Sequence, residues 1–181
     1  MGRGERPEWE EPEGSLPMPP LQIESILRLL LDHSVEFIVI GGFSLSVHGI
    51  VRATKDIDIV PAPSGANLRR LAGALAELDA EPLLADDFSA GELGIRPDEQ
   101  GLALGGNWVL RTRFGRLDVM QAVEGAADYA GLRQRAVSAE VPNAGDCLFA
   151  SLDDLIAMKL AAGRPQDRID VASLERARTG G

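Results

Sequence analysis

The chain has 181 residues and a formal net charge of −10, so we expect one acidic domain rather than several. That charge argues against non-specific nucleic-acid binding, which depends on Lys and Arg neutralising phosphates, but it leaves room for a local basic groove. The single cysteine, Cys147, cannot form an internal disulfide, and no apolar run reaches the roughly 18 residues of a membrane span. We therefore expect a cytoplasmic protein with no membrane partner.

Residues 1–20 are predicted to form a flexible acidic tail. They hold five prolines and five glutamates, and such a segment cannot bury enough apolar surface to order itself. Residues 21–181 are then predicted to form a single domain, in which the sequence contains no internal repeat.

The first half of this domain alternates between helical and strand patterns. Apolar residues recur every three or four positions from Ile23 to Leu30, which predicts a helix. The run "VEFIVI" is β-branched and too short for a helix, so it predicts a strand. The predicted order is helix 21–34, strand 35–40, short helix 43–49, strand 53–61 and a helix over 64–80 capped by Ser64.

The second half begins with residues 81–106, which are rich in Gly, Asp and Pro and give no clear pattern. Beyond them, residues 107–123 predict two strands folded at Phe114-Gly115, and 136–151 predict a weaker pair. Cap and stop signals then delimit two helices, 151–163 and 164–178. The whole order predicts an α/β (α+β) fold: a small mixed sheet, built from hairpins and one crossover, flanked by helices.

Asp56 and Asp58 stand one residue apart in a segment that otherwise predicts a buried strand. Because side chains alternate along a strand, both carboxylates should point to one face, while Ile57 and Ile59 point into the core. Two adjacent carboxylates raise each other's pKa unless a cation lies between them. Asp118 is a third carboxylate in an apolar strand, so the three predict a site for two Mg²⁺ ions. For any one aspartate, an exposed strand face or a salt bridge is the alternative.

Gly41-Gly42 follows a predicted strand and precedes a short helix, a place where the backbone can approach phosphates closely. Ser44 can add a hydroxyl to the same phosphates. Most Gly-Gly pairs are only tight turns. Here, however, the spacing from Gly42 to Asp56 allows a short helix to bring the two strands side by side.

Two segments resemble known proteins. "GGFS" followed by "RATKDID" resembles the signature of the nucleotidyltransferase superfamily related to DNA polymerase β, in its minimal form. "SLDDLIAMKLAAGRPQDRIDVASL" resembles the C-terminal motif of the abortive-infection, type IV toxin–antitoxin branch. The resemblance covers roughly residues 37–174, apart from 81–106. It implies the nucleotidyltransferase fold and an enzyme of the EC 2.7.7 type that uses an NTP as donor.

By that resemblance, the site residues divide by role. Metal binding and catalysis fall to Asp56, Asp58 and Asp118, with Asp118 helping to deprotonate the acceptor hydroxyl. Triphosphate binding falls to Gly41, Gly42, Ser44 and Lys159, and the acceptor side to Arg164 and Asp167. Arg52 flanks the aspartates, and we expect it to contact phosphate too. A lysine on a capped helix is usually a solvated cation, but the apolar neighbours in "AMKLAAG" indicate an anionic partner for Lys159.

The sequence leaves the acceptor open: a protein side chain, as in toxin–antitoxin pairs, a tRNA end, or a small molecule such as an aminoglycoside. The acidic charge favours a protein or a cationic small molecule. Because the sequence holds little beyond the predicted catalytic core, we expect a cognate partner protein, a homodimer mate or a small, shallow site to hold the acceptor.

Two other classes of function compete with the enzyme. One is a non-catalytic nucleotide- or partner-binding module, antitoxin-like, that retains the fold, although all three carboxylates are intact here. The other is a structural domain in which the aspartates pair with Arg52, Arg111 or Arg116.

Overall fold

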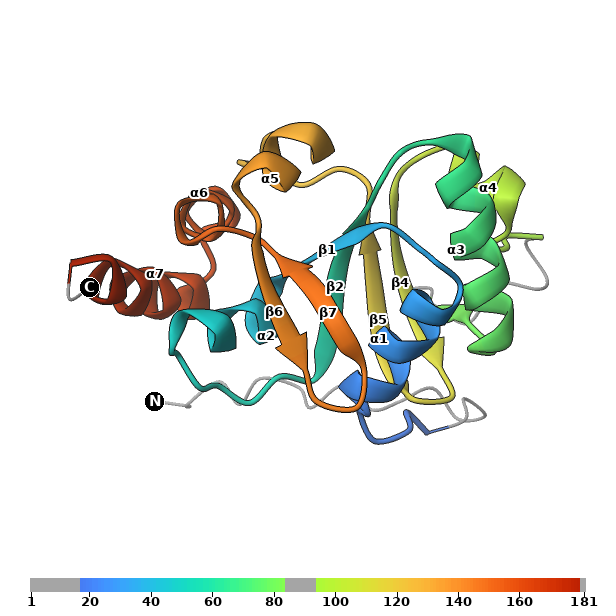
Figure 1. The fold of residues 1–181 in the computed structure, drawn as a ribbon, viewed down its shortest axis with the longest axis horizontal. Coiled ribbons are helices and arrows are strands. Elements are labelled where there is room, and N and C mark those ends of the chain that lie inside the picture. The colour runs from blue at the N-terminus through green and yellow to red at the C-terminus, as the bar shows by residue number, and fades with distance from the viewer. Residues whose placement is uncertain (1–16, 84–93, 180–181) are drawn as a thin grey trace, which may run out of the picture.

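The computed structural model describes residues 17–83 and 94–179, and these form a seven-stranded sheet with helices on both faces (Figure 1). The strands are β1 (Phe37–Ile40), β2 (Asp56–Pro61), β3 (Glu81–Pro82), β4 (Asn107–Thr112), β5 (Gly115–Met120), β6 (Val137–Val141) and β7 (Gly145–Phe149). Their order in the sheet is β3-β4-β5-β2-β1-β7-β6. β2 lies antiparallel to β1 and parallel to β5, while β1 is also parallel to β7. The predicted mixed sheet flanked by helices is confirmed.

The described residues contain seven α-helices and one 3₁₀ helix. They are α1 (Ile23–Asp32), α2 (Gly41–Ser44), the 3₁₀ helix η1 (Leu45–His48), α3 (Gly65–Glu77), α4 (Glu99–Ala103), α5 (Tyr129–Arg135), α6 (Leu152–Ala162) and α7 (Pro165–Thr179). The Ser64 hydroxyl accepts a hydrogen bond from the backbone N–H of Asn67 at 3.3 Å, and Ser151 accepts one from Asp154 at 3.1 Å. Both serines therefore supply the predicted N-caps.

Each face of the sheet carries its own hydrophobic core. The first core packs α1 and α3 against one face of the central strands, and the second packs η1, α5, α6 and α7 against the other. Ile57 and Ile59 are fully buried in the first core. Because side chains alternate along β2, Asp56 and Asp58 lie on the face of the second core, as predicted. Leu117 and Val119 of β5 belong to the first core as well, which places Asp118 beside Asp58.

The fold departs from the predicted elements in a few places. β3, α4 and α5 were not predicted, because each is short and none shows a clear apolar period. The sheet has two parallel contacts, β2–β5 and β1–β7, where one crossover was expected. β2 begins at Asp56 rather than Ala53, because the Thr54 hydroxyl turns back onto the Asp56 carbonyl oxygen at 2.8 Å.

The flexible tail predicted at the start of the chain is not tested. Residues 1–16 lie outside the described residues, so the flexible tail over 1–20 stays a prediction. Within residues 17–83 and 94–179, no helix is both long enough and apolar enough to cross a membrane.

Candidate active site

Two parallel strands bring the three predicted carboxylates to one place. In the β2–β5 register, Asp58 lies opposite Asp118, and Asp56 lies opposite Arg116. Asp118 is buried, whereas Asp56 and Asp58 are partly exposed. We call Asp56, Asp58, Asp118 and Arg116 the carboxylate wall.

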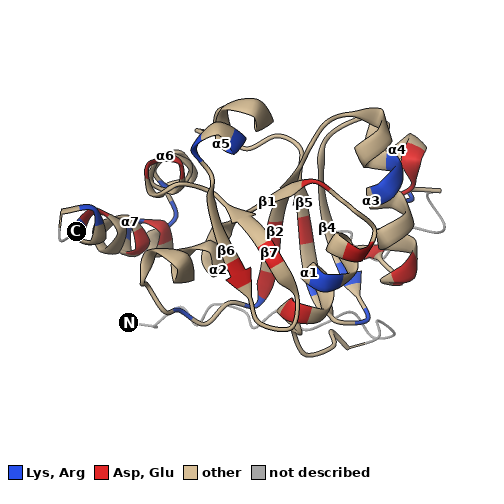
Figure 2. Cartoon of the chain, viewed as in Figure 1, with Lys and Arg blue, Asp and Glu red and all other residues tan. Residues whose placement is uncertain are grey.

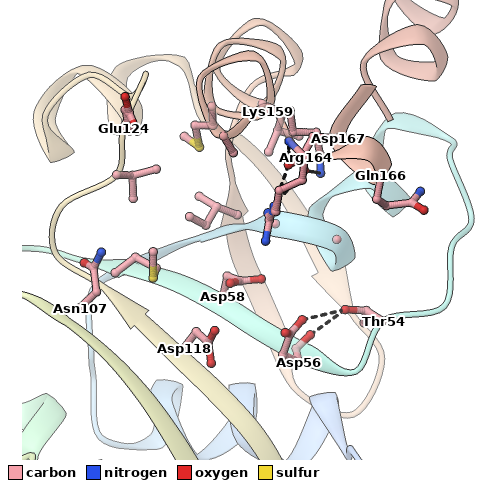
Figure 3. Close-up of a pocket in the computed structure, with 18 of the residues that line it drawn as sticks. Thr54, Asp56, Asp58, Asn107, Asp118, Glu124, Lys159, Arg164, Gln166 and Asp167 are labelled. Carbon is pink, nitrogen blue, oxygen red and sulfur yellow. Dashed lines mark hydrogen bonds and ion pairs between the residues drawn. The ribbon is translucent and has the colours of Figure 1, made fainter. Parts of the chain in front are cut away.

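The carboxylate wall borders a cavity of about 680 Å³ (Figure 3). Figure 3 shows the side chains of Asp56, Asp58 and Asp118 on the strands below, with Lys159 and Asp167 on the helices above them and Arg164 between those helices. Other polar lining comes from Gly41, Gly42, Arg52, Thr54, Asn107, Glu124 and Gln166. The apolar part of the lining is Ile40, Met120, Ala122, Val123, Leu155, Met158 and Ala162. The cavity therefore joins a charged side to an apolar side.

Asp58 has the most perturbed acidity of the wall. Burial, followed by the charges of Asp56 and Asp118, raises its pKa from 3.8 to about 7, although Arg116 and Arg164 act against that rise. Negative charge is thus crowded around Asp58, and an added cation would relieve it.

Arg116 is the cation already present in the wall. Its Nε donates to Asp118 Oδ1 at 2.8 Å, its second guanidinium nitrogen donates to Oδ2 at 2.7 Å, and Nε lies 3.8 Å from Asp56 Oδ2. The hydrogen bond to Asp118 raises the pKa of Arg116, so this arginine keeps its charge. Of the three arginines considered as structural partners, Arg116 pairs with a wall carboxylate, whereas Arg111 pairs with Glu81.

Gly41 fits tightly against Asp58. Its φ is +70°, and a Cβ placed on it would lie 2.0 Å from Asp58 Oδ2, so a larger residue would have to displace that carboxylate. Ser44 is fully buried, and its hydroxyl donates to the Gly41 carbonyl oxygen at 2.6 Å. Ser44 thus stabilises the turn at Gly41. It lies outside the cavity lining, and its role toward phosphate stays a prediction.

Lys159 and Arg52 both line the cavity, and both are held by one acid. Lys159 is only 8% exposed, and its Nζ donates to Asp170 Oδ2 at 2.7 Å and lies 3.6 Å from Asp167 Oδ1. The guanidinium of Arg52 donates to the same oxygen of Asp170. The anionic partner that the sequence indicates for Lys159 is thus supplied, in this structure, by the protein itself.

Arg164 completes this group from the start of α7. Its Nε donates to Asp167 Oδ2 at 2.7 Å, while most of its side chain stays exposed beside the cavity. Burial alone would raise the pKa of Asp167, but the hydrogen bonds and charge of Arg164, together with Lys159, lower it below its usual 3.8. We call Arg52, Lys159, Arg164, Asp167 and Asp170 the ion-pair cluster.

Sequence reasoning missed two contributors, Asp170 and Thr54, and named Arg116 only as a structural partner of the aspartates. Asp170 follows Asp167 by three positions, so on a helix the two share one face, a signal visible in "DRID". Arg116 precedes Asp118 by two positions and therefore shares its strand face. Thr54 gave no signal that distinguishes it from an ordinary loop residue; its hydroxyl lies 3.2 Å from Asp56 Oδ1.

The donor set of the carboxylate wall fits a divalent cation in part. Within the described residues, no group of three or more His, Cys, Asp or Glu side chains is arranged to hold a metal ion as it stands. Carboxylate oxygens nevertheless suit Mg²⁺, which keeps water and phosphate oxygens as further ligands. The crowded charge at Asp58 favours such an ion. Both oxygens of Asp118 accept from Arg116, but a carboxylate has about four lone-pair sites, so Asp118 retains room for another partner.

Comparison with known proteins identifies a family and a fold. The sequence model of one family, described as "Nucleotidyltransferase of unknown function (DUF6036)", matches residues 21–176. No curated protein sequence matches the chain. A crystal structure of ANT(2″)-Ia in complex with adenylyl-2″-tobramycin is similar, with a TM-score of 0.55 and 15% identity over 87% of each chain. A solution structure of the antibiotic-resistance factor ANT(2″)-Ia gives 0.53 and 13%, covering 86% of this chain and 83% of that one. At such identities the likeness establishes the fold alone.

Proposed function

Because the chain belongs to this nucleotidyltransferase family, we propose that it moves a nucleoside monophosphate from an NTP to an acceptor hydroxyl. The observation that carries the proposal is one cavity lined both by crowded strand carboxylates and by the cations Arg52 and Lys159. The carboxylates suit a metal ion, and the cations suit phosphates.

In this proposal, Asp56 and Asp58, with Asp118, would hold Mg²⁺, two ions once the phosphates are present. Bound Mg²⁺ would neutralise phosphate charge and lower the pKa of the attacking hydroxyl. The oxygen of the acceptor hydroxyl bonds to the α-phosphorus, and the bond between that phosphorus and pyrophosphate breaks. Asp118 accepts the proton that the hydroxyl loses.

The remaining lining residues bind and orient the two substrates. The backbone at Gly41 and Gly42 approaches the triphosphate, and Arg52 and Lys159 donate to its oxygens. Arg164 and Asp167 face the acceptor. The apolar lining around Met120, Val123 and Met158 would pack against the nucleoside or the acceptor and exclude water.

The acceptor is a protein, a tRNA or a small molecule. ANT(2″)-Ia is described with adenylyl-2″-tobramycin, so an aminoglycoside belongs among the acceptors to be offered. The net charge of −10 favours a protein or a cationic small molecule over a tRNA. A cognate partner protein would connect the chain with toxin–antitoxin systems, and a homodimer mate could also complete the acceptor site. The single cysteine supports a cytoplasmic location.

A structural domain is one alternative to the enzyme, beside the non-catalytic binding module, and the pairing of Arg116 with Asp118 is the observation that favours it. If that pair only stabilises the sheet, Mg²⁺ and NTP will not raise the melting temperature. If the wall binds metal, they will.

The test is transfer of label from each α-labelled NTP with Mg²⁺, offering total tRNA, a cell lysate, tobramycin and the protein itself. The Asp56→Asn, Asp58→Asn double variant should abolish transfer. The matched control is Asp146→Asn, Asp153→Asn, which removes two charges at exposed positions outside this cavity and should leave transfer intact. Absence of label on every acceptor, together with no thermal shift, would leave the binding module as the better explanation.

A further inference from the structure

Asp170 is a buried carboxylate of α7 that lies outside the cavity lining. Its Oδ2 accepts from Lys159 Nζ at 2.7 Å and from the Arg52 guanidinium, and its Oδ1 accepts from Gln166 Nε2 at 3.2 Å. The three donors come from different parts of the chain: α6, the segment between η1 and β2, and the start of α7. One buried side chain therefore fixes groups from three segments.

We infer that Asp170 is a positioning residue that holds Arg52 and Lys159 in place for a polyphosphate. The inference rests on the proposed function, in which these two cations bind the NTP. Because Asp170 does not line the cavity, it acts through the two cations and does not touch the substrate.

The donor count supports this role. A lysine ammonium has three N–H donors and an arginine guanidinium has five, so one bond from each to Asp170 leaves donors free for phosphate oxygens. Both side chains are long and lose much rotamer freedom when they bind a ligand. Asp170 fixes them before the ligand arrives, which preorganises the site.

The charge of the ion-pair cluster points to an anionic ligand as well. Three cations, Arg52, Lys159 and Arg164, are paired with two carboxylates, Asp167 and Asp170. The cluster itself therefore carries one surplus positive charge, and a polyphosphate would be drawn to it once Mg²⁺ neutralises the facing carboxylates.

A purely structural explanation competes with this one, because Asp170 also ties α6 to α7. The chain contains a matched control in Asp154, a buried helical carboxylate whose Oδ1 accepts from Arg135 at 2.6 Å. Asp154 lies outside the lining of the cavity, so replacing it removes the ion pair of a buried carboxylate with a half-exposed arginine and leaves the contacts of Arg52 and Lys159 in place.

The experiment measures binding of inorganic triphosphate and of ATP, with Mg²⁺, by titration calorimetry on the full chain. Asp170→Asn should bind both ligands about tenfold or more weakly than wild type, because it loses a charge-assisted partner of each cation. Asp154→Asn should bind both as wild type does. Equal affinity of Asp170→Asn and wild type, or equal losses in the two variants, would overturn the inference.

A charge-balanced pair covers the case in which Asp170→Asn does not fold. Arg52→Gln, Asp170→Asn removes one charge of each sign and is compared with Arg52→Gln alone. Weaker triphosphate binding by the double variant supports positioning through Lys159, and equal binding overturns it. If wild type binds neither ligand, the proposed function and this inference fail together, whereas failure of the variants alone leaves the proposed function standing.

Discussion

The carboxylate wall and the ion-pair cluster face each other across one cavity, and they differ in how far their charges are compensated. The wall holds three carboxylates and one arginine, while the cluster holds three cations and two carboxylates. Figure 2 shows acidic residues on β2 and β5, and residues of both signs on α6 and α7. The cluster is nearly balanced by its own partners. The wall carries excess negative charge that a ligand must neutralise.

The pKa values of two aspartates show the difference between the wall and the cluster. The pKa of Asp58 in the wall is raised to about 7 by burial and like charges, while the pKa of Asp167 in the cluster is lowered by Arg164 and Lys159, which outweigh its burial. The same residue type thus destabilises the fold in one place when ionised and stabilises it in the other. A buried carboxylate that works against folding marks the wall as a candidate functional site.

Removing the buried cation of the cluster should have the largest effect on stability. Lys159→Met leaves Asp167 and Asp170 buried without their shared ammonium, so we expect the free energy of unfolding to fall by about 3–5 kcal/mol. Urea denaturation followed by circular dichroism measures this change. Arg178→Met breaks an exposed ion pair to Asp153 and should cost less than about 1 kcal/mol. Equal losses of unfolding free energy in the two variants would contradict this prediction, because Lys159 would then stabilise the fold no more than an exposed cation does.

Ionisation of Asp58 should weaken the metal-free fold as the pH rises. Its pKa is about 7 when folded and near 3.8 when unfolded, so the folded chain binds the extra proton between these values. Relative to Asp58→Asn, wild type should lose about 2 kcal/mol of unfolding free energy between about pH 5.5 and pH 8. Urea denaturation at the two pH values, without Mg²⁺, measures this loss.

The matching change in the cluster should have the opposite sign. Asp167→Asn removes a carboxylate whose ionised form is stabilised, so it should destabilise the protein at pH 8. If Asp58→Asn also destabilises at pH 8, the wall is balanced in solution and the predicted excess of negative charge is wrong.

The smallest effect concerns the turn that supports the wall. Gly41→Ala and Gly49→Ala both place alanine at positive φ, +70° and +78°, but a Cβ at Gly49 meets nothing within 4 Å. We expect Gly41→Ala to cost about 1 kcal/mol more than Gly49→Ala, because its methyl group displaces the Asp58 carboxylate. Thermal denaturation measures the difference. Gly41→Ala should also reduce the rise in melting temperature that Mg²⁺ causes. If Mg²⁺ raises the melting temperature of both variants equally, the turn at Gly41 does not support metal binding by the wall.

The sequence predicted the wall better than the cluster, for a physical reason. Strand alternation places Asp56 and Asp58 on one face of β2, so their meeting with Asp118 needed only the pairing and register of β2 with β5. The pairing of Arg116 with Asp118 follows the same rule, and the sequence had named Arg116 among the possible partners of the aspartates.

The cluster depends on how α6 packs against α7, and no local pattern determines that packing. The apolar setting of Lys159 correctly indicated an anionic partner, but only the tertiary structure identifies Asp170. The short elements β3, α4 and α5 were missed because they lack an apolar period of useful length. The roles predicted for all the site residues toward metal, nucleotide and acceptor stay predictions.

The parallel contact of β1 with β7 has a consequence for how the cavity is made. It joins Ile38 to Leu148 and Val39 to Phe149, residues more than a hundred positions apart, and α6 and α7 follow only after β7. During synthesis, the carboxylate strands leave the ribosome well before the cations of α6 and α7 exist, and contacts over such sequence separations form slowly. We therefore expect nucleotide binding to be acquired in the last step of folding, when α7 docks, so that an incompletely synthesised chain would carry the carboxylates without being able to use an NTP.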